Sequence, residues 1–489
     1  MTIREDFDSI ELMDAVQMEL IDTLTGKKHL RLSGKSQVTL NQERFVNRDV
    51  QVVVVLLAAA IMCYPAAGEN VKQAEVGAGR PQVIYFDGGS LQKAIDDAPA
   101  HSTVICNANR RMIFERPVVI NKALTLSGIN AALAKGVGKT SLLVVEANGV
   151  TIRDFALYGN VDSVKQRDRA PLMVIVAGDF TVEKGLFVNS TKDGVTINGG
   201  EKGDTVGGVI RDVVGRGNGR DVISISGGKG GPRVRNVLVE NVRCYRSRGK
   251  GGVEVSDGTD NITVRKVYAE DSTYAVDVQD HGRRGQVNSN ILIEDVYALN
   301  CKHAVRTDNS DKGHSNLTVR DVTARLCREP VKISNTRHVI LENVRVIEHK
   351  RAVEAIGIFN CDGVSVGDVT VVDSICDDAV ILLENCNSVS VNGLTLRGQI
   401  SEAASGVKYI ITSGESFSDL RISNVAAPRV KKAGIMLAKT EKGGTLSDYF
   451  ICGNLARVVD NIKGERSFIR NNMSLGAEQS ETDRRGNSQ

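Results

Sequence analysis

Tryptophan is absent from this sequence of 489 residues, proline occurs only 8 times, and aromatic residues make up 4%. No two cysteines have the CxxC spacing of a zinc site. Neither sign of charge dominates, since the chain has 62 lysines and arginines and 59 aspartates and glutamates. Electrostatics therefore give no reason to expect a nucleic-acid partner. The 48 glycines and 41% hydrophobic residues argue against a disordered, collagen-like or polytopic membrane protein.

An uncharged apolar run, VVVVLLAAAIM, occupies residues 52–62 and is followed by small residues. This pattern predicts a signal-peptide-like segment over 50–68, because the run is shorter than the roughly 20 residues that span a bilayer. We therefore expect a secreted, periplasmic or cell-surface protein. No stable membrane span is expected in the mature form, and the chain would be membrane-anchored if the segment 52–68 is not cleaved. Residues 1–49 form a charged extension, which a start site assigned too early would explain, and 69–87 form a linker.

A short phrase recurs eight times between residues 236 and 425, as in Asn236-VLVEN-Val242 and Asn316-LTVRD-Val322. Within each copy apolar and polar residues alternate and β-branched residues dominate, which is typical of a strand. A shorter strand, such as Val276-Asp-Val278, falls between successive copies. Two strands per repeat, separated by corners rich in glycine, asparagine and aspartate, predict one coil of a parallel β-helix.

Other repeat architectures fit the pattern less well. The LxxLxLxxN frame of leucine-rich repeats is missing, and a propeller blade needs about 40 residues. In a parallel solenoid the coils stack about 4.8 Å apart, and inward valines and isoleucines fill a narrow core in which bulky aromatic rings fit poorly. The solenoid is expected over 88–476, with about 11–13 coils at this repeat length, followed by a disordered tail at 477–489.

The predicted solenoid begins with a short helix, for which Ser90 is the N-cap. The apolar face of this helix consists of Leu91, Ala94, Ile95 and Ala98. The helix would close the open end of the core. The strands that follow, including Asn121-KALTLSG, resemble the entry coil of the pectate-lyase-like superfamily. The resemblance implies an all-β fold, a right-handed, single-stranded parallel β-helix with an N-terminal capping helix.

Stacking of the short strands would align their outward side chains in columns. One predicted column contains Thr196, Ser224, Glu254, Asp277, Arg306 and Lys332. The next contains Asn198, Ser226, Ser256, Gln279, Asp308 and Ser334. Two acids followed by two bases on consecutive coils indicate either a polar substrate groove or a solvated face whose neighbouring charges pair weakly.

Two corners resemble the signature of polygalacturonase-type glycoside hydrolases, the inverting pectin hydrolases of this superfamily. Lys192-Asp193-Gly194 is similar to their Asn-Thr-Asp-Gly motif, with a threonine at position 191 in place of asparagine. Arg220-Asp221 is similar to their Asp-Asp motif, and Lys250-Gly251-Gly252 stands where they have Gly-His-Gly. The resemblance implies that Asp193 and Asp221 activate a water molecule for hydrolysis.

The general acid of that family is replaced here by Arg220. Inverting hydrolysis needs a protonated carboxylic acid at the leaving oxygen, so another coil would have to supply it, and Glu254 and Asp277 are the nearest candidates. The two carboxyls could lie about 5 Å apart on adjacent coils, which is closer to retaining than to inverting geometry. The predicted catalytic residues are Asp193, Asp221, Glu254 and Asp277.

A polysaccharide lyase is the alternative enzyme. It needs a base for the proton α to a uronate carboxylate, and cations that neutralise that carboxylate. Arg306, Lys332 and Lys250 could supply the cations, and Glu254 with Asp277 could hold a calcium ion. No other cofactor or metal is expected. The predicted substrate-binding residues are Arg220, Lys250, Arg306, Lys332, His281 and Asp308.

These observations lead to one functional hypothesis and an alternative from another class. The first is an exported carbohydrate-active β-helix protein that cleaves glycosidic bonds of an acidic polysaccharide, as a hydrolase in preference to a lyase. The alternative is a non-catalytic surface solenoid that binds glycans or proteins. The mixed charge column favours the enzyme, whereas the scarcity of aromatic rings, on which sugars stack, favours the binding protein.

Overall fold

The computed structural model describes two units of the chain separately. Residues 19–22, 28–31 and 37–39 are described in the first unit, and residues 80–473 in the second. Gaps in the second unit fall at 166–167, 201–202, 228–230, 282–286, 310–312, 401–403, 428–429, 431, 463 and 465. The signal-like segment at 50–68 and the tail at 477–489 lie outside the described residues. No helix in the described residues has the length and apolar character to cross a membrane.

The first unit contains a three-stranded antiparallel sheet in the order β1-β2-β3. Its strands are β1 (Glu19–Asp22), β2 (Lys28–Arg31) and β3 (Gln37–Thr39). These strands fall within residues 1–49, the predicted charged extension.

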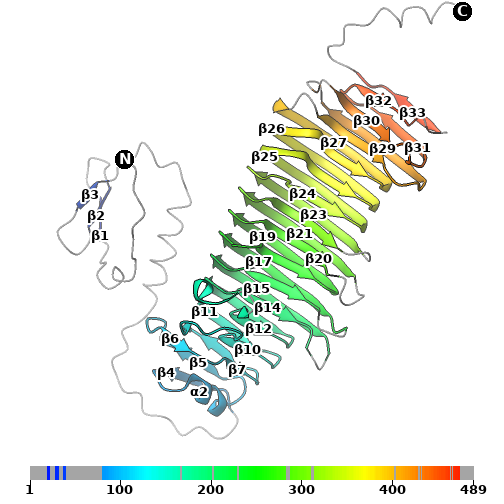
Figure 1. The fold of residues 1–489 in the computed structure, drawn as a ribbon. Coiled ribbons are helices and arrows are strands. Elements are labelled where there is room, and N and C mark those ends of the chain that lie inside the picture. The colour runs from blue at the N-terminus through cyan, green and yellow to red at the C-terminus, as the bar shows by residue number, and fades with distance from the viewer. Residues whose placement is uncertain are drawn as a thin grey trace, which may run out of the picture. The chain divides into compact units, whose positions relative to one another are not determined.

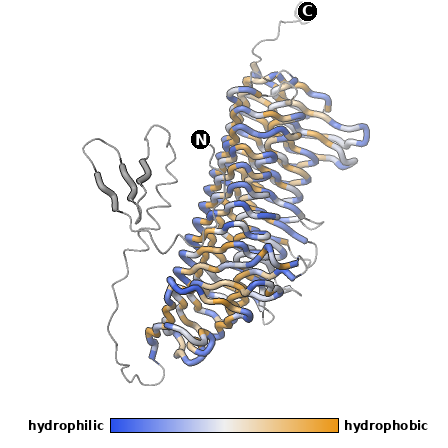
Figure 2. Tube along the Cα trace, turned by 60° about the vertical axis from the view of Figure 1, so that its left-hand side comes forward, coloured by the Kyte–Doolittle hydropathy of each residue, from blue (hydrophilic) through white to orange (hydrophobic). Residues whose placement is uncertain are grey.

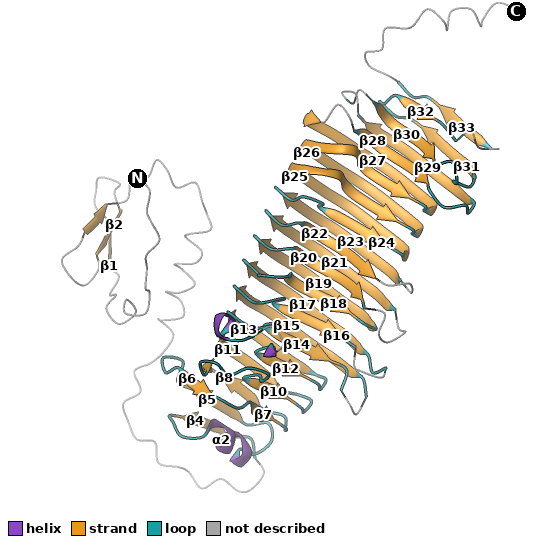
Figure 3. Ribbon diagram, viewed as in Figure 1, coloured by secondary structure: helices purple, strands orange, loops and turns teal. Residues whose placement is uncertain are grey.

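The second unit is a right-handed parallel β-helix of about 13 turns, as the sequence predicted (Figure 1). Almost every described residue outside the corners is in a strand (Figure 3). Hydrophobic and hydrophilic residues alternate along the coils (Figure 2), so that each strand turns its apolar side chains into the core.

The first coils are built from short elements. They are β4 (Val83–Phe86), α2 (Leu91–Asp97), β5 (Thr103–Cys106), β6 (Met112–Phe114), β7 (Val118–Ile120), β8 (Thr125–Ser127), β9 (Asn130–Leu133), β10 (Leu143–Val145) and a 3-10 turn at Val161–Ser163. Helix α2 follows Ser90, whose Oγ accepts a hydrogen bond from the backbone of Lys93. It buries Leu91 and Ile95 in the core, while its role in closing the end of the core remains a prediction.

The sheet of the solenoid begins earlier than expected. Strand β4 pairs in parallel with β5, which places regular structure inside the segment 69–87 that was predicted to be a linker. The strand was missed because it has only four residues and leaves Val83 and Tyr85 exposed.

From residue 151 on, longer strands form one face of the solenoid and shorter strands another. The longer ones are β11 (Thr151–Tyr158), β13 (Phe180–Val188), β15 (Thr205–Arg216), β17 (Val234–Tyr245), β19 (Thr259–Glu270), β21 (Asn288–Leu299), β23 (His314–Arg325), β25 (Thr336–Phe359), β26 (Asp362–Glu384), β27 (Asn387–Ile400), β29 (Phe417–Ala426), β31 (Leu446–Cys452) and β33 (Ser467–Arg470). The shorter ones, which we call the short-strand sheet, are β12 (Met173–Ile175), β14 (Val195–Asn198), β16 (Ile223–Ser226), β18 (Gly251–Ser256), β20 (Tyr274–Asp280), β22 (His303–Asn309), β24 (Val331–Ser334), β28 (Ser405–Ile411), β30 (Ala433–Lys439) and β32 (Val458–Asp460). Strands β25 and β26 continue round the corner, and their last residues complete this sheet.

The register of the short-strand sheet confirms the predicted charge column. Thr196, Ser224, Glu254, Asp277, Arg306 and Lys332 pair successively from coil to coil. The second column pairs in the same way from Asn198 to Asp308. The side chains that carry charge are therefore aligned along the helix axis.

The first residue of the recurring phrase lies in a corner whose backbone geometry restricts the residue type. Asn236, Asn261, Asn290, Asn316 and His338 have φ between 53° and 58°. This left-handed conformation is costly for most side chains and is best tolerated by glycine, asparagine and aspartate. The phrase is thus a positive-φ corner followed by a strand.

The core accepts larger rings than expected. Phe155, Phe180 and Tyr274 are almost completely buried, although bulky aromatic residues were predicted to fit poorly. Each ring lies opposite a glycine on a neighbouring coil: Phe155 opposite Gly185, Phe180 opposite Gly208, and Tyr274 opposite Gly251. A Cβ atom on Gly185 would lie only 1.9 Å from the ring of Phe155. Glycines therefore provide the space that the narrow core lacks.

Candidate active site

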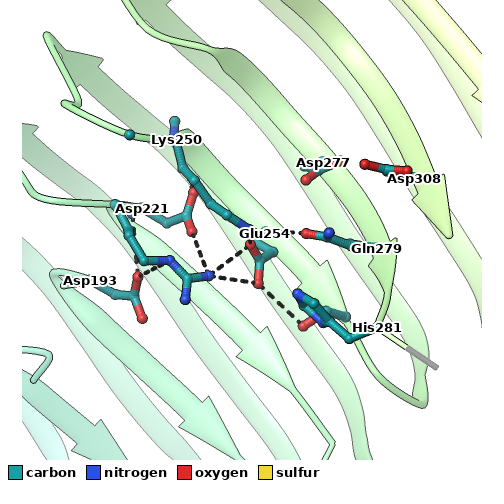
Figure 4. Close-up of polar contacts among 12 residues, drawn as sticks. Asp193, Asp221, Lys250, Glu254, Asp277, Gln279, His281 and Asp308 are labelled. Carbon is teal, nitrogen blue, oxygen red and sulfur yellow. Dashed lines mark hydrogen bonds and ion pairs between the residues drawn. The ribbon is translucent and has the colours of Figure 1, made fainter. Parts of the chain in front are cut away.

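Four consecutive coils bring the predicted acids together at one edge of the short-strand sheet. Asp193 and Asp221 lie in the corners that precede β14 and β16, whereas Glu254 and Asp277 point outward from β18 and β20. Figure 4 shows these side chains in one neighbourhood, with Lys250 beside them. Stacking of the coils positions all of them.

Arg220 lies at the centre of three of these acids. Its Nη2 donates to Glu254 at 3.1 and 3.2 Å, its Nε lies 3.6 Å from Asp193, and Nη2 lies 3.7 Å from Asp221. The carboxylates of Asp193 and Asp221 are fully buried and that of Glu254 is 2% exposed, whereas the Arg220 side chain is 28% exposed. The acids thus form the wall of the site, and the cation covers them on the solvent side.

Tyr274 connects Asp221 and Glu254 from inside the coil. Its hydroxyl donates to Asp221 Oδ1 at 2.7 Å and lies 3.3 Å from Glu254 Oε2. The backbone N–H of Gly251 also donates to Asp221 Oδ1, at 3.1 Å. The other oxygen, Asp221 Oδ2, is buried without a hydrogen bond among the described residues. Its nearest charged neighbour is the guanidinium of Arg220, whose Nη2 lies 3.7 Å away.

The environments of Asp221 and Glu254 drive their pKa values apart. Burial, together with the charges of Glu254 and Asp193, raises the pKa of Asp221 well above its ordinary value. Burial also disfavours the charged form of Glu254, but the cations of Lys250 and Arg220 outweigh it and lower the pKa of Glu254. One cluster of charges thus raises the pKa of Asp221 and lowers the pKa of its neighbour Glu254.

Lys250 covers Glu254 from the other side. Its ammonium forms an ion pair with Glu254 Oε2 and donates to Gln279 Oε1 at 2.9 Å. The Lys250 side chain is 21% exposed. Gln279 belongs to the second column, so the two columns meet at this lysine.

Asp277 and Arg306 form a second buried pair one coil further along. The guanidinium donates to both carboxylate oxygens, at 3.0 and 2.6 Å. It also lies 3.4 Å from Asp308, which is half exposed. Burial raises the pKa of Asp277 to about 6, although Arg306 acts in the opposite direction. Asp277 therefore serves as the buried partner of a cation rather than as a free carboxylate.

The raised pKa of Asp277 predicts a specific pH dependence. The native protein holds this proton to a higher pH than the unfolded chain does, so stability should fall as pH rises from about 4 to about 6. An Asp277→Asn variant lacks this titration. Relative to the variant, the wild type should lose about 2–3 kcal/mol of unfolding free energy over that interval, as measured by urea unfolding. Asp308→Asn is the matched control, and a constant difference between wild type and Asp277→Asn would contradict the expectation.

His281 is held in place by a residue that sequence reasoning missed. Its Nδ1 lies 2.9 and 3.1 Å from the two carboxylate oxygens of Asp257, and its backbone N–H donates to Asp257 at 2.8 Å. With Nδ1–H donated to the carboxylate, Nε2 carries the lone pair. His281 is 25% exposed on its side chain and close enough to affect the pKa of Glu254. The remainder of its corner, 282–286, lies outside the described residues.

The predicted site residues fall into two groups. The structure brings Asp193, Asp221, Glu254, Arg220, Lys250, Asp277, Arg306, Asp308 and His281 into one neighbourhood. Lys332 lies three coils beyond Glu254 in the column, about 14 Å away at the usual strand spacing. Tyr274 and Asp257 were missed. The register could have placed both in the site, because Tyr274 opens β20 and Asp257 directly follows the second column.

Glu254 and Asp277 do not suit a calcium ion. Both oxygens of Asp277 accept from Arg306, and the oxygens of Glu254 accept from Arg220 and Lys250. Calcium needs several oxygen ligands, and three adjacent cations would repel it. The structure shows no group of three or more histidine, cysteine, aspartate or glutamate side chains within 80–473, outside the gaps, that could hold a metal ion.

Comparisons with known proteins show likeness at the level of the fold. No protein-family model and no curated protein sequence matches the chain. The A-module of the Azotobacter vinelandii mannuronan C-5 epimerase AlgE4 is 16% identical with a TM-score of 0.43, over 78% of this chain and 94% of that one. The catalytic domain of a GH87 α-1,3-glucanase is 11% identical with a TM-score of 0.36, over 83% and 70%. The N-terminal fragment of bacteriophage Phi29 gene product 12 is 14% identical with a TM-score of 0.47, over 74% and 63%.

Proposed function

We propose that this protein binds an acidic polysaccharide along the short-strand sheet and cleaves it by β-elimination. The observation that carries the proposal is the arrangement of charge. The cationic side chains of Arg220, Lys250 and Arg306 are 28%, 21% and 18% exposed, whereas Asp193 and Asp277 are fully buried beneath them. A uronate chain approaching the site would meet cations first, and its carboxylates would pair with them.

β-Elimination would give each of these side chains a role. Arg220 would neutralise the uronate carboxylate and so make the α proton more acidic. His281, with its Nε2 lone pair fixed by Asp257, would take that proton. The electron pair of the broken C–H bond forms the double bond as the bond to the glycosidic oxygen breaks, and the departing oxygen takes a proton from Lys250. The reaction leaves an unsaturated sugar and a new chain end.

Hydrolysis is the second candidate, and the opposed pKa values of Asp221 and Glu254 favour it. A protonated and an ionised carboxyl side by side are the arrangement that general acid and base roles require. Both groups, however, are covered by Arg220, and Asp221 is fully buried. Hydrolysis would require the arginine to move aside, whereas β-elimination uses the exposed side chains as they stand. This reverses the preference that the sequence suggested.

Product analysis separates the candidates. The full chain is incubated with polygalacturonate, alginate, hyaluronan and a neutral α-1,3-glucan, and both reducing ends and the ultraviolet absorbance of conjugated double bonds are followed. We expect both signals to rise together on at least one acidic polymer and neither to rise on the glucan. Reducing ends without absorbance would establish hydrolysis instead. Retention of an acidic polymer without either signal would establish a binding protein. Such a polymer lies outside cells, in keeping with the export predicted from 50–68.

A further inference from the structure

A second group of side chains converges further along the same sheet. Lys332 pairs in register with Gly357, and the neighbouring position of the second column is taken by Phe359. A Cβ atom on Gly357 would lie 2.5 Å from the Phe359 ring and 2.9 Å from Oε1 of Glu354. The absence of a side chain at Gly357 thus allows the ring and the carboxyl to meet over the strand.

Lys332 differs from the other cations along this sheet. Arg220, Lys250 and Arg306 all form ion pairs with buried acids. The Lys332 ammonium forms no ion pair with any described residue, and lies 5.7 Å from the centre of the Phe359 ring. It is partly exposed. A cation kept without a counter-charge, beside an aromatic ring, is suited to an anionic ligand.

Glu354 is also without a partner. The residue as a whole is 8% exposed. No hydrogen bond or ion pair joins its carboxyl to a described residue, and its oxygens are not among the buried polar atoms that lack a partner, so they reach the surface. Burial and the charge of Glu329 raise the pKa of this carboxyl, and Lys332 acts in the opposite direction. A ligand hydroxyl that contacts these oxygens would supply the hydrogen bond that the described residues do not.

We propose that Lys332, Phe359 and Glu354 form a remote subsite for a negatively charged sugar of the same polymer. Phe359 packs against the face of the sugar ring, Lys332 pairs with its carboxylate, and the Glu354 carboxyl forms a hydrogen bond with a hydroxyl of the same ring. The inference rests on the proposed function, because it assumes that an acidic polymer follows the sheet. Gly357 is four coils from Glu254, about 19 Å at the usual strand spacing, so only a chain of several sugars could reach both places.

The ring over Gly357 is unlike the rings of the core. Phe155 and Tyr274 are buried against glycines inside the coils. Phe359 occupies an outward column and is partly exposed. Its position is therefore one from which a sugar can be contacted.

The test measures affinity rather than cleavage. Calorimetry gives the dissociation constants of octasaccharides and trisaccharides of galacturonate and mannuronate, with a neutral maltooctaose as reference. Lys332→Met and Phe359→Ala should each weaken binding of an acidic octasaccharide about tenfold, a loss of roughly 1.4 kcal/mol, and leave trisaccharide binding unchanged. Lys266→Met and Phe450→Ala, on the long-strand side, are the matched controls. If Phe359→Ala does not fold, binding by Lys332→Met alone tests the proposal.

Glu354→Gln adds a second measurement, the pH dependence of octasaccharide affinity. This dependence would not differ between wild type and variant if Glu354 had only a structural role. The charged groups that act on Glu354 are Glu329, Lys332, Asp378 and Glu384. As pH rises through the raised pKa of Glu354, its charge should repel the sugar carboxylate, so the wild type should lose octasaccharide affinity while Glu354→Gln keeps it.

The outcomes distinguish the two proposals. Equal weakening of octasaccharide and trisaccharide, no weakening by either variant, or wild-type binding of neither acidic octasaccharide would overturn the subsite. An octasaccharide that binds with the expected length dependence but is never cleaved would leave the subsite standing and remove the β-elimination.

Discussion

Replacing Arg220 by methionine is expected to lower the free energy of unfolding by about 3–5 kcal/mol at neutral pH. The guanidinium lies among Asp193, Asp221 and Glu254, which are 0–2% exposed. Its loss leaves buried carboxylates of like charge with one cation fewer. Urea unfolding of wild type and variant measures the difference. Arg211→Met, which breaks the exposed ion pair with Glu183, is the control and should change stability little.

The deficit of Arg220→Met should shrink as the pH falls. Without the cation, the pKa values of the buried carboxyls rise, so the native variant binds protons that the unfolded chain has already released. A carboxyl whose native pKa exceeds its unfolded value loses stability as pH increases between the two. Unfolding near pH 5 should therefore show a smaller difference from the wild type than unfolding near pH 8. A deficit independent of pH would mean that the cation contributes packing alone.

Replacing His281 by alanine is expected to lower kcat by about 10²–10⁴-fold, the contribution usual for a general base. The fold should be unaffected, because the side chain is partly exposed and contacts Asp257 from a corner. Formation of unsaturated product measures the loss on whichever acidic polymer the wild type cleaves. His338→Ala, which alters an exposed histidine on the long-strand side, should retain full activity. Unchanged kcat in His281→Ala would place the base elsewhere.

Asp257 acts through His281 and is a positioning residue. An Asp257→Asn variant keeps the size of the side chain but removes the charge that fixes the imidazole tautomer. We expect its pH–rate profile to shift, whereas a merely structural role would lower activity equally at every pH.

The alignment of the site could be predicted from the sequence because the solenoid has one register. Alternation of apolar residues identified the short strands, and one coil per repeat then placed Glu254, Asp277 and Arg306 in a single column, as observed. No long-range packing had to be known. The same regularity predicted corners at the asparagines that open the recurring phrase, and these asparagines have positive φ in the structure.

The state of the acids could not be predicted in this way. Register specifies which residues are neighbours, but not which long side chain reaches across coils. Arg220, read as a lost general acid, instead reaches Glu254 on the next coil. Tyr274 reaches Asp221, 53 residues earlier in the chain. The burial of the carboxylates depends on these rotamers. So does the exposure of the cations that cover them, which is the reason for preferring β-elimination to hydrolysis.

The pairing of aromatic rings with glycines one coil away limits how such a protein can change its number of coils. Deleting the coil that contains Gly185 would bring Val213 opposite Phe155, because these three positions follow one another in register. The ring would then meet a branched side chain in a space that a single methyl group already overfills. Gain or loss of a coil in evolution is therefore expected in the stretches stacked only with valine and isoleucine, or together with a simultaneous change of ring and glycine.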